Sequence, residues 1–152
     1  MKLAEALLLR TEQQQKLELL EGRIRANLKV QEGDTPHEAP EALLQEAMEV
    51  NESLCALVQR INRTNHILQL EDGTTLADAL ARREMLRKKR LLLSNLAGEA
   101  QQRDYRLTHS EVKMRLTLDL AALQKEIDAL SRQFRELDTR IQGVNWTCDL
   151  AE

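Results

Sequence analysis

Residues 119–146 read DLAALQKEIDALSRQFRELDTRIQGVNW and hold the most regular pattern of the chain. Apolar side chains recur there at alternating intervals of three and four residues, at Leu120, Leu123, Ile127, Leu130, Phe134, Leu137, Ile141 and Val144. This spacing predicts a long amphipathic helix with one apolar stripe of the coiled-coil type. At about 1.5 Å per residue the helix would be roughly 40 Å long, so we expect other helices to lie alongside it.

The composition favours the same fold class. The 152 residues include one Trp, one Tyr and one Phe, so the core must consist mostly of Leu, Ile, Val, Ala and Met. Leucine-rich cores with many charged residues are typical of helical bundles. We therefore predict a single all-α domain over 1–152, a bundle of four long, mostly antiparallel helices with coiled-coil-like packing. Since 22 basic residues nearly balance 25 acidic ones, no whole-molecule field attracts nucleic acid or membrane.

The first segment, about 2–28, carries leucines and isoleucines on one broad side and predicts a helix. Arg10 and Gln14 fall on its expected apolar stripe. Either the stripe rotates around the helix, or polar side chains meet inside an interface between helices. We prefer the rotating stripe.

The second helix follows a predicted loop at 29–39. Pro40 suits the first turn of a helix because proline has no backbone N–H to leave unpaired. An alternative start at Thr35 would use Glu38, three residues later, in a capping box. We expect the helical pattern to end where the chain turns polar, at 62–65.

The second helix also has a widened apolar stripe. Leu44, Met48 and Cys55 lie beside its main series of apolar positions. A wide stripe indicates contact from two sides, so we expect Cys55 to be a core residue.

The third helix is predicted to begin after Thr75, which can act as its cap with Asp78, and to run to about 98. Beyond it, residues 112–118 alternate apolar and polar side chains, a pattern typical of an extended segment. Its partner would be 68–70 or, failing that, another subunit.

No constellation of residues indicates catalysis. His37, His66 and His109 lie in three separate linking segments, and none has a second metal ligand three or four residues away. The chain contains no glycine-rich phosphate loop and no nucleophile elbow. We therefore expect a protein that is not an enzyme, with no metal, no cofactor and no identifiable small-molecule substrate.

Two polar clusters are candidates for interaction with partners. A helix spreads the basic run 82–90 around its circumference, so its six cations cannot all face one phosphate-rich ligand. We expect some to pair with acidic residues of neighbouring helices, such as Glu126, Asp128, Glu136 or Asp138. The candidate interaction residues are Arg82, Arg83, Arg87, Lys88, Lys89 and Arg90 in this run, and Arg60, Asn62, Arg63 and Asn65 in the cluster 60–65.

The sequence favours the cytoplasm. Leu3 to Leu9 is interrupted by Glu5 and is not followed by a signal-cleavage pattern, and no apolar run is long enough to span a bilayer. Cys55 and Cys148 have no neighbouring cysteine, so two reduced thiols are expected.

Five stretches together resemble the septicolysin-like family of small bacterial helical proteins. They are KVQEGD at 29–34, RINRTN at 60–65, LEDGTTLADALARR at 70–83, DLAALQK at 119–125 and LDTRIQGVNWTCDL at 137–150. The resemblance implies an all-α, self-associating protein whose biochemical role is unsettled. The family name suggests a cytolysin, although the chain contains no cationic amphipathic surface helix that would support one. Cys148 stands where the family leads us to expect Thr, and Ala39 where it leads us to expect an acidic cap.

We therefore expect a non-catalytic cytoplasmic helical bundle that acts through self-association or protein partners, most simply as a homo-oligomer. Two alternatives belong to other classes. Nucleic acid or another polyanion could bind through 82–90, or the protein could be a membrane-active cytolysin. The roles of the clusters 60–65 and 70–75 are left open at this point.

Overall fold

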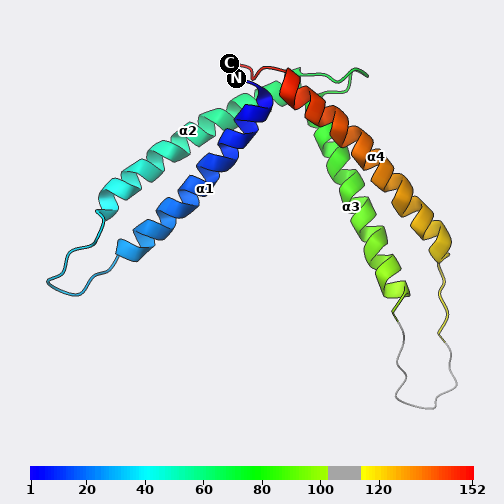
Figure 1. Ribbon diagram of the computed structural model, residues 1–152, viewed down its shortest axis with the longest axis horizontal. Coiled ribbons are helices and arrows are strands. Elements are labelled where there is room, and N and C mark those ends of the chain that lie inside the picture. Colours follow the sequence, from blue (N-terminus) through cyan, green and yellow to red (C-terminus); the bar gives the residue numbers. More distant parts are fainter. Residues whose placement is uncertain (103–113) are drawn as a thin grey trace, which may run out of the picture. The chain divides into compact units, whose positions relative to one another are not determined.

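The computed structural model describes residues 1–102 and 114–152 and contains four long helices (Figure 1). They are α1 (Leu3–Asn27), α2 (Pro40–Ile67), α3 (Leu76–Ala100) and α4 (Leu120–Thr147). The part of the chain described here forms no strand. The predicted all-α class with four long helices is confirmed.

The chain divides into two compact units. The first consists of Met1–Leu76 and Gln142–Glu152, and the second of Ala77–Ile141. Helix α4 crosses the boundary, so its last turns belong to the first unit while most of its length belongs to the second. The prediction of a single domain stays a prediction.

Each unit contains one antiparallel pair of helices. In the first unit, α1 lies alongside α2, and Lys16 Nζ contacts Glu46 Oε1 at 2.7 Å (Figure 1). In the second unit, Arg83 of α3 reaches Asp138 of α4 at 2.6 Å. Lys16, just past the middle of α1, meets Glu46 near the start of α2, and Arg83 in the first half of α3 meets Asp138 in the second half of α4, as antiparallel packing requires.

The apolar stripe of α4 is covered along its length. The helix is continuous from Leu120 to Thr147. Ile127, Leu130 and Ile141 are buried, and the remaining five side chains of the predicted stripe are half-buried. Burial of the stripe excludes its apolar surface from water, which is the main favourable contribution to helix packing.

Polar side chains of α1 and α2 meet at an exposed level of the pair. Gln13 Nε2 donates a 3.0 Å hydrogen bond to Ser53 Oγ, while Gln13 Oε1 and Arg10 Nε are buried without a partner. Gln14, by contrast, is exposed. Each interpretation therefore holds in part: Gln14 is turned to solvent, as a rotating stripe predicts, while Arg10 and Gln13 each bury one polar atom, as the alternative predicts.

The start of α2 is confirmed and its end is not. Pro40 occupies the first turn, and the alternative start at Thr35 is wrong because Glu38 lies in the loop and pairs with Arg23 of α1. At the other end, α2 does not stop at 62–65 but continues to Ile67.

The loop between α2 and α3 closes on itself. Leu70 N donates to Thr74 O at 2.9 Å, and Gly73 adopts a positive φ of 80°, which glycine tolerates because it lacks a Cβ. Residues 68–70 therefore pair within their own turn, so the predicted pairing with 112–118 is wrong. Residues 114–118 are exposed and form no strand, and 112–113 lie outside the described residues.

Candidate functional site

The basic run on α3 is distributed around the helix, and most of its cations contact an anion or an aromatic ring. Arg83 pairs with Asp138, and Lys89 lies 3.4 Å from Glu126, so both join α3 to α4. The guanidinium of Arg90 lies over the Phe134 ring, 5.7 Å from its centroid. Such a contact combines cation–π attraction with packing of the side-chain stem.

The other cations of this run pair within α3 or line a groove. Arg87 donates to Glu84 at 2.7 and 2.8 Å, and Lys88 lies 3.9 Å from the same carboxylate. The hydrogen bond from Arg87 lowers the pKa of Glu84, and the same contact raises the pKa of Arg87. The expected pairing of the run with acidic groups is thus observed, with Asp138 and Glu126 among the residues named from the sequence.

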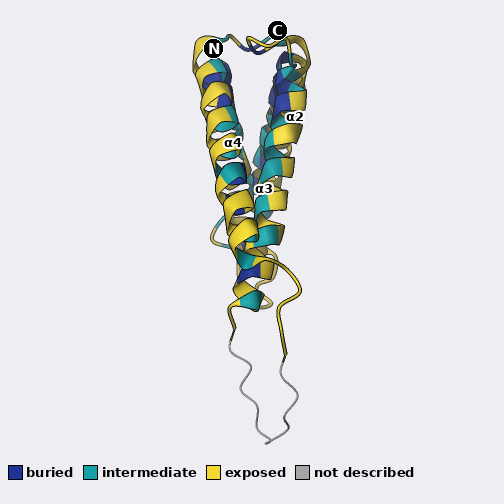
Figure 2. Cartoon of the chain, turned by 90° about the vertical axis from the view of Figure 1, so that its right-hand side faces the viewer, coloured by how far each residue is buried: buried dark blue, intermediate teal, exposed yellow. Residues whose placement is uncertain are grey.

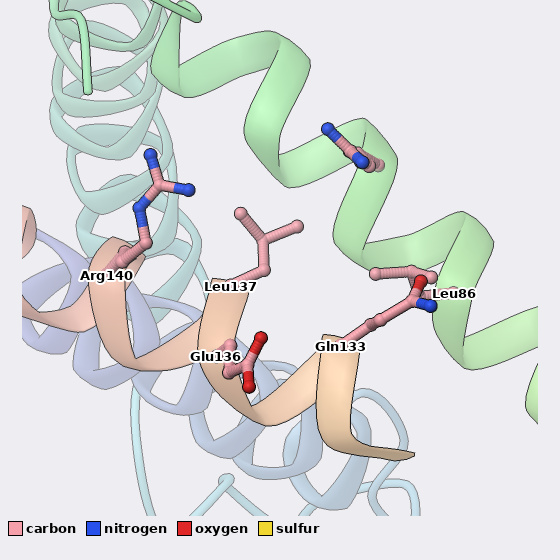
Figure 3. Close-up of a pocket in the computed structure, with 6 residues that line it drawn as sticks. Leu86, Gln133, Glu136, Leu137 and Arg140 are labelled. Atoms are coloured by element: carbon pink, nitrogen blue, oxygen red, sulfur yellow. The ribbon is translucent and has the colours of Figure 1, made fainter. Parts of the chain in front are cut away.

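A groove lies between α3 and α4 in the second unit (Figure 3). The groove has a volume of about 160 Å³ and a mixed apolar and polar lining. The lining residues are Arg82, Leu86, Gln133, Glu136, Leu137 and Arg140. Pockets for small organic ligands usually measure roughly 300–1,000 Å³. The groove is therefore smaller than the usual pocket for such a ligand. Of its lining, the sequence indicated Arg82 as an interaction residue, Glu136 as a possible partner of the basic run and Leu137 as part of the apolar stripe.

The cluster 60–65 holds the C-terminal segment of the chain. Arg60 Nε donates to Ala151 O at 3.0 Å, and Ala151 N donates to Thr64 Oγ1 at 2.9 Å. Thr64 is buried and its hydroxyl in turn donates to Arg60 O at 2.8 Å. Asn62 and Arg63 are exposed, and Asn65 is half-buried. Within this cluster, Arg60 therefore holds the C-terminal segment, whereas Asn62 and Arg63 face solvent.

The two ends of the chain pair with each other in the first unit. Leu3 N donates to Cys148 O at 3.0 Å, and Leu150 N donates to Met1 O at 2.9 Å. Lys2 Nζ lies 2.9 Å from Asp149 Oδ1, and its hydrogen bond lowers the pKa of that carboxyl. Sequence reasoning missed this arrangement, because backbone amides carry no signature in the sequence.

Large apolar side chains remain exposed on the outer sides of the helices, which are coloured by burial in Figure 2. Cys55 is among the exposed residues, so its prediction as a core residue is wrong within this chain. The stripe that it shares with Leu44 and Met48 does lie beside the core positions of α2, but nothing in the described chain covers it. The exposed large apolar residues of the four helices are Leu8, Leu19, Leu44, Met48, Ile67, Met85, Leu91, Leu92, Leu96 and Trp146.

The titratable side chains do not converge on one point. His37 is exposed, His66 Nδ1 lies 2.7 Å from Asn62 O, and His109 lies outside the described residues. Within 1–102 and 114–152, no three His, Cys, Asp or Glu side chains are grouped so that they could hold a metal ion. Over the same residues, none of the helices has the length and apolar character needed to cross a membrane.

Comparison with known proteins identifies relatives whose function is also open. The model of a family of unknown function, DUF6847, matches residues 10–150. No curated protein sequence matches the chain. A crystal structure of a functionally unknown conserved protein from Corynebacterium diphtheriae is 42% identical, with a TM-score of 0.92 over 99% of this chain and 98% of the other. The resemblance to septicolysin-like proteins stays a prediction.

Proposed function

The chain belongs to the DUF6847 family of unknown function, and we propose that it is a non-catalytic cytoplasmic protein that acts by self-association through its helix surfaces. The proposal rests on one observation above all. Helices α1, α2 and α3 each bury one side in their own unit and carry two or more large apolar side chains that remain exposed, whereas α4 exposes only Trp146 among its large apolar residues.

The spacing of these exposed side chains supports an interface. Isolated exposed leucines are normal on protein surfaces, whereas apolar side chains that recur along one side of a helix form a continuous patch. On α2, Leu44 is 49% exposed and Met48 is 52% exposed, four residues apart. A patch of this kind is stabilised when another protein surface removes it from water.

The charges favour protein contact over polyanion binding. Arg83 already contacts a carboxylate of α4 in a pair only about one-third exposed, and Arg90 contacts an aromatic ring. A phosphate-rich ligand would have to compete with these partners, which weakens the electrostatic attraction that such binding needs.

The ionised pairs with shifted pKa values support a non-catalytic role. Glu46 beside Lys16, Glu84 beside Arg87 and Asp149 beside Lys2 have lowered pKa values because a cation donates to each carboxylate. These pairs lie on exposed helix or terminal surfaces and not together in the groove. Shifted groups at a catalytic site would instead gather around one cavity.

Light scattering of the purified chain at micromolar concentration tests the proposal. The chain has a mass of 17.5 kDa, so a self-associating protein should give at least twice this value. A constant mass of one chain across the micromolar range would contradict the proposed function.

A further inference from the structure

Helix α2 presents a second apolar stripe with an acidic border. Leu44, Met48 and Cys55 are exposed and follow one another at intervals of four and seven residues. At 3.6 residues per turn these intervals place all three on one side of the helix. Glu41 and Glu52 border the same side, at the spacing of neighbouring positions on the helix.

Helix α3 presents an apolar stripe of the same length with a basic border. Met85, Leu92 and Leu96 are 56%, 58% and 39% exposed and follow one another at intervals of seven and four residues. The exposed Lys88 and Lys89 flank this stripe. Lys88 lies 3.9 Å from Glu84 and Lys89 lies 3.4 Å from Glu126, both in exposed pairs that cost little to rearrange.

The two stripes are complementary when the helices run in opposite directions. Along α2 the stripe residues are separated by four and then seven residues. Along α3, followed from Leu96 back to Met85, they are also separated by four and then seven. Leu44 faces Leu96, Met48 faces Leu92, and Cys55 faces the level of Met85. In this register Glu52 lies at the level of Lys88 and Lys89, so opposite charges border the apolar contact at this end, while Glu41 lies at the level of Glu99 at the other end.

Extending the self-association proposed above, on which this inference rests, we propose that α2 of one copy packs antiparallel against α3 of a second copy. Pairing α2 with α2 would bring two acidic borders together, and pairing α3 with α3 would bring two pairs of lysines together. Like charges at an interface disfavour association, so the opposite charges of Glu52 and the two lysines favour the α2–α3 contact.

Disulfide trapping tests the register, because Cys55 already lies on the α2 stripe. A Cys148→Ser parent retains Cys55 as its sole thiol. Adding Met85→Cys to this parent should give chains linked in pairs on a non-reducing gel after oxidation with copper phenanthroline. Adding Leu91→Cys instead provides the matched control, since Leu91 is also exposed, at 50%, but points to another side of α3.

The gel has distinct outcomes. The proposed contact is supported if the Met85→Cys variant gives linked chains and the Leu91→Cys variant and the parent give few linked chains. Equal linking in both variants, or linking in the parent through Cys55 alone, overturns it. A Met85→Cys protein that stays at the mass of one chain also overturns it, and circular dichroism of each variant checks that its helices are retained.

A charge exchange separates this inference from the proposed function. Sedimentation equilibrium should show association at least about tenfold weaker for Lys88→Glu with Lys89→Glu, and recovery when Glu52→Lys is added. If the unaltered chain associates but these variants associate equally well, the α2–α3 contact is wrong and self-association stands. If the unaltered chain is monomeric, both proposals fail.

Discussion

The backbone amide of Ala151 donates a hydrogen bond to the hydroxyl of Thr64, which lies 87 residues earlier in the chain. The same hydroxyl donates to Arg60 O, and Arg60 Nε donates to Ala151 O. Two of these three bonds attach the C-terminal segment to the end of α2, and the third lies within α2. The polar residues at 60–65 therefore hold another part of the chain while the helix continues to Ile67.

Replacing Thr64 by valine should lower the free energy of unfolding by about 1–3 kcal/mol. Valine keeps the shape of threonine, but the partly buried amide of Ala151 would then lack an acceptor. Urea unfolding followed by circular dichroism measures the change. Thr11→Val is the matched control, since the hydroxyl of Thr11 donates to Leu7 O on an exposed surface and should change stability by less than about 0.5 kcal/mol.

The buried, unpaired Gln13 Oε1 on α1 should cost stability. Gln13→Leu combined with Ser53→Ala removes a hydrogen bond together with the buried, unpaired Gln13 Oε1. Replacing both partners by apolar groups is neutral or stabilising, whereas Ser53→Ala alone leaves the Gln13 amide with fewer partners. The urea midpoint of the double variant should equal or exceed that of the unaltered chain and should exceed that of Ser53→Ala. A double variant less stable than Ser53→Ala would contradict this interpretation.

The ion pair between Arg83 and Asp138 should contribute more than an exposed pair within one helix. Both of its side chains are about one-third exposed, whereas Arg87 and Glu84 are each nearly half exposed. Double-mutant cycles with Arg83→Met and Asp138→Asn, and with Arg87→Met and Glu84→Gln, measure each coupling. We expect about 0.5–1 kcal/mol for the first pair and about 0.3 kcal/mol for the second. Equal coupling free energies would show that an ion pair between two helices stabilises the fold no more than one within a single helix.

Stability should fall in acid because paired carboxylates must be protonated. The pKa of Glu46 lies below its ordinary value of 4.5 and that of Asp149 below 3.8, because Lys16 and Lys2 donate to them. At pH values between the lower folded-state pKa and the ordinary pKa, the folded state therefore binds fewer protons than the unfolded state. Their contribution is present above the unfolded-state pKa and is lost as the pH falls through the lower folded-state pKa. Urea midpoints from pH 7 down to pH 2 should fall less steeply for Glu46→Gln with Asp149→Asn.

The helices could be predicted from the sequence because periodicity is a local signal. The stripe from Leu120 to Val144 and the helix start at Pro40 depend on residues within a few turns of one another. The end of α2 could not be predicted in this way. Thr64 is polar, and besides its local bond to Arg60 O its hydroxyl accepts a hydrogen bond from the distant Ala151, a contact that the local sequence does not show.

The surfaces were harder to predict than the helices. The second stripe of α2 was recognised from Leu44, Met48 and Cys55, but hydropathy cannot distinguish a side covered within the chain from one that is exposed. The groove depends on which residues of α4, such as Leu137 and Arg140, lie opposite α3. That relation follows from the register of two helices separated by a long connection and not from either sequence alone.

Sedimentation equilibrium of the unaltered chain, from low to high micromolar concentration, tests the central claim most directly. The exposed apolar sides of the helices predict an apparent mass that rises from about that of one chain, 17.5 kDa, to a multiple of it. Met48→Glu places a charge on the α2 stripe and should shift this rise to higher concentration. A mass of one chain at every concentration, for the unaltered protein as for Met48→Glu, would contradict the claim that these surfaces exist for association.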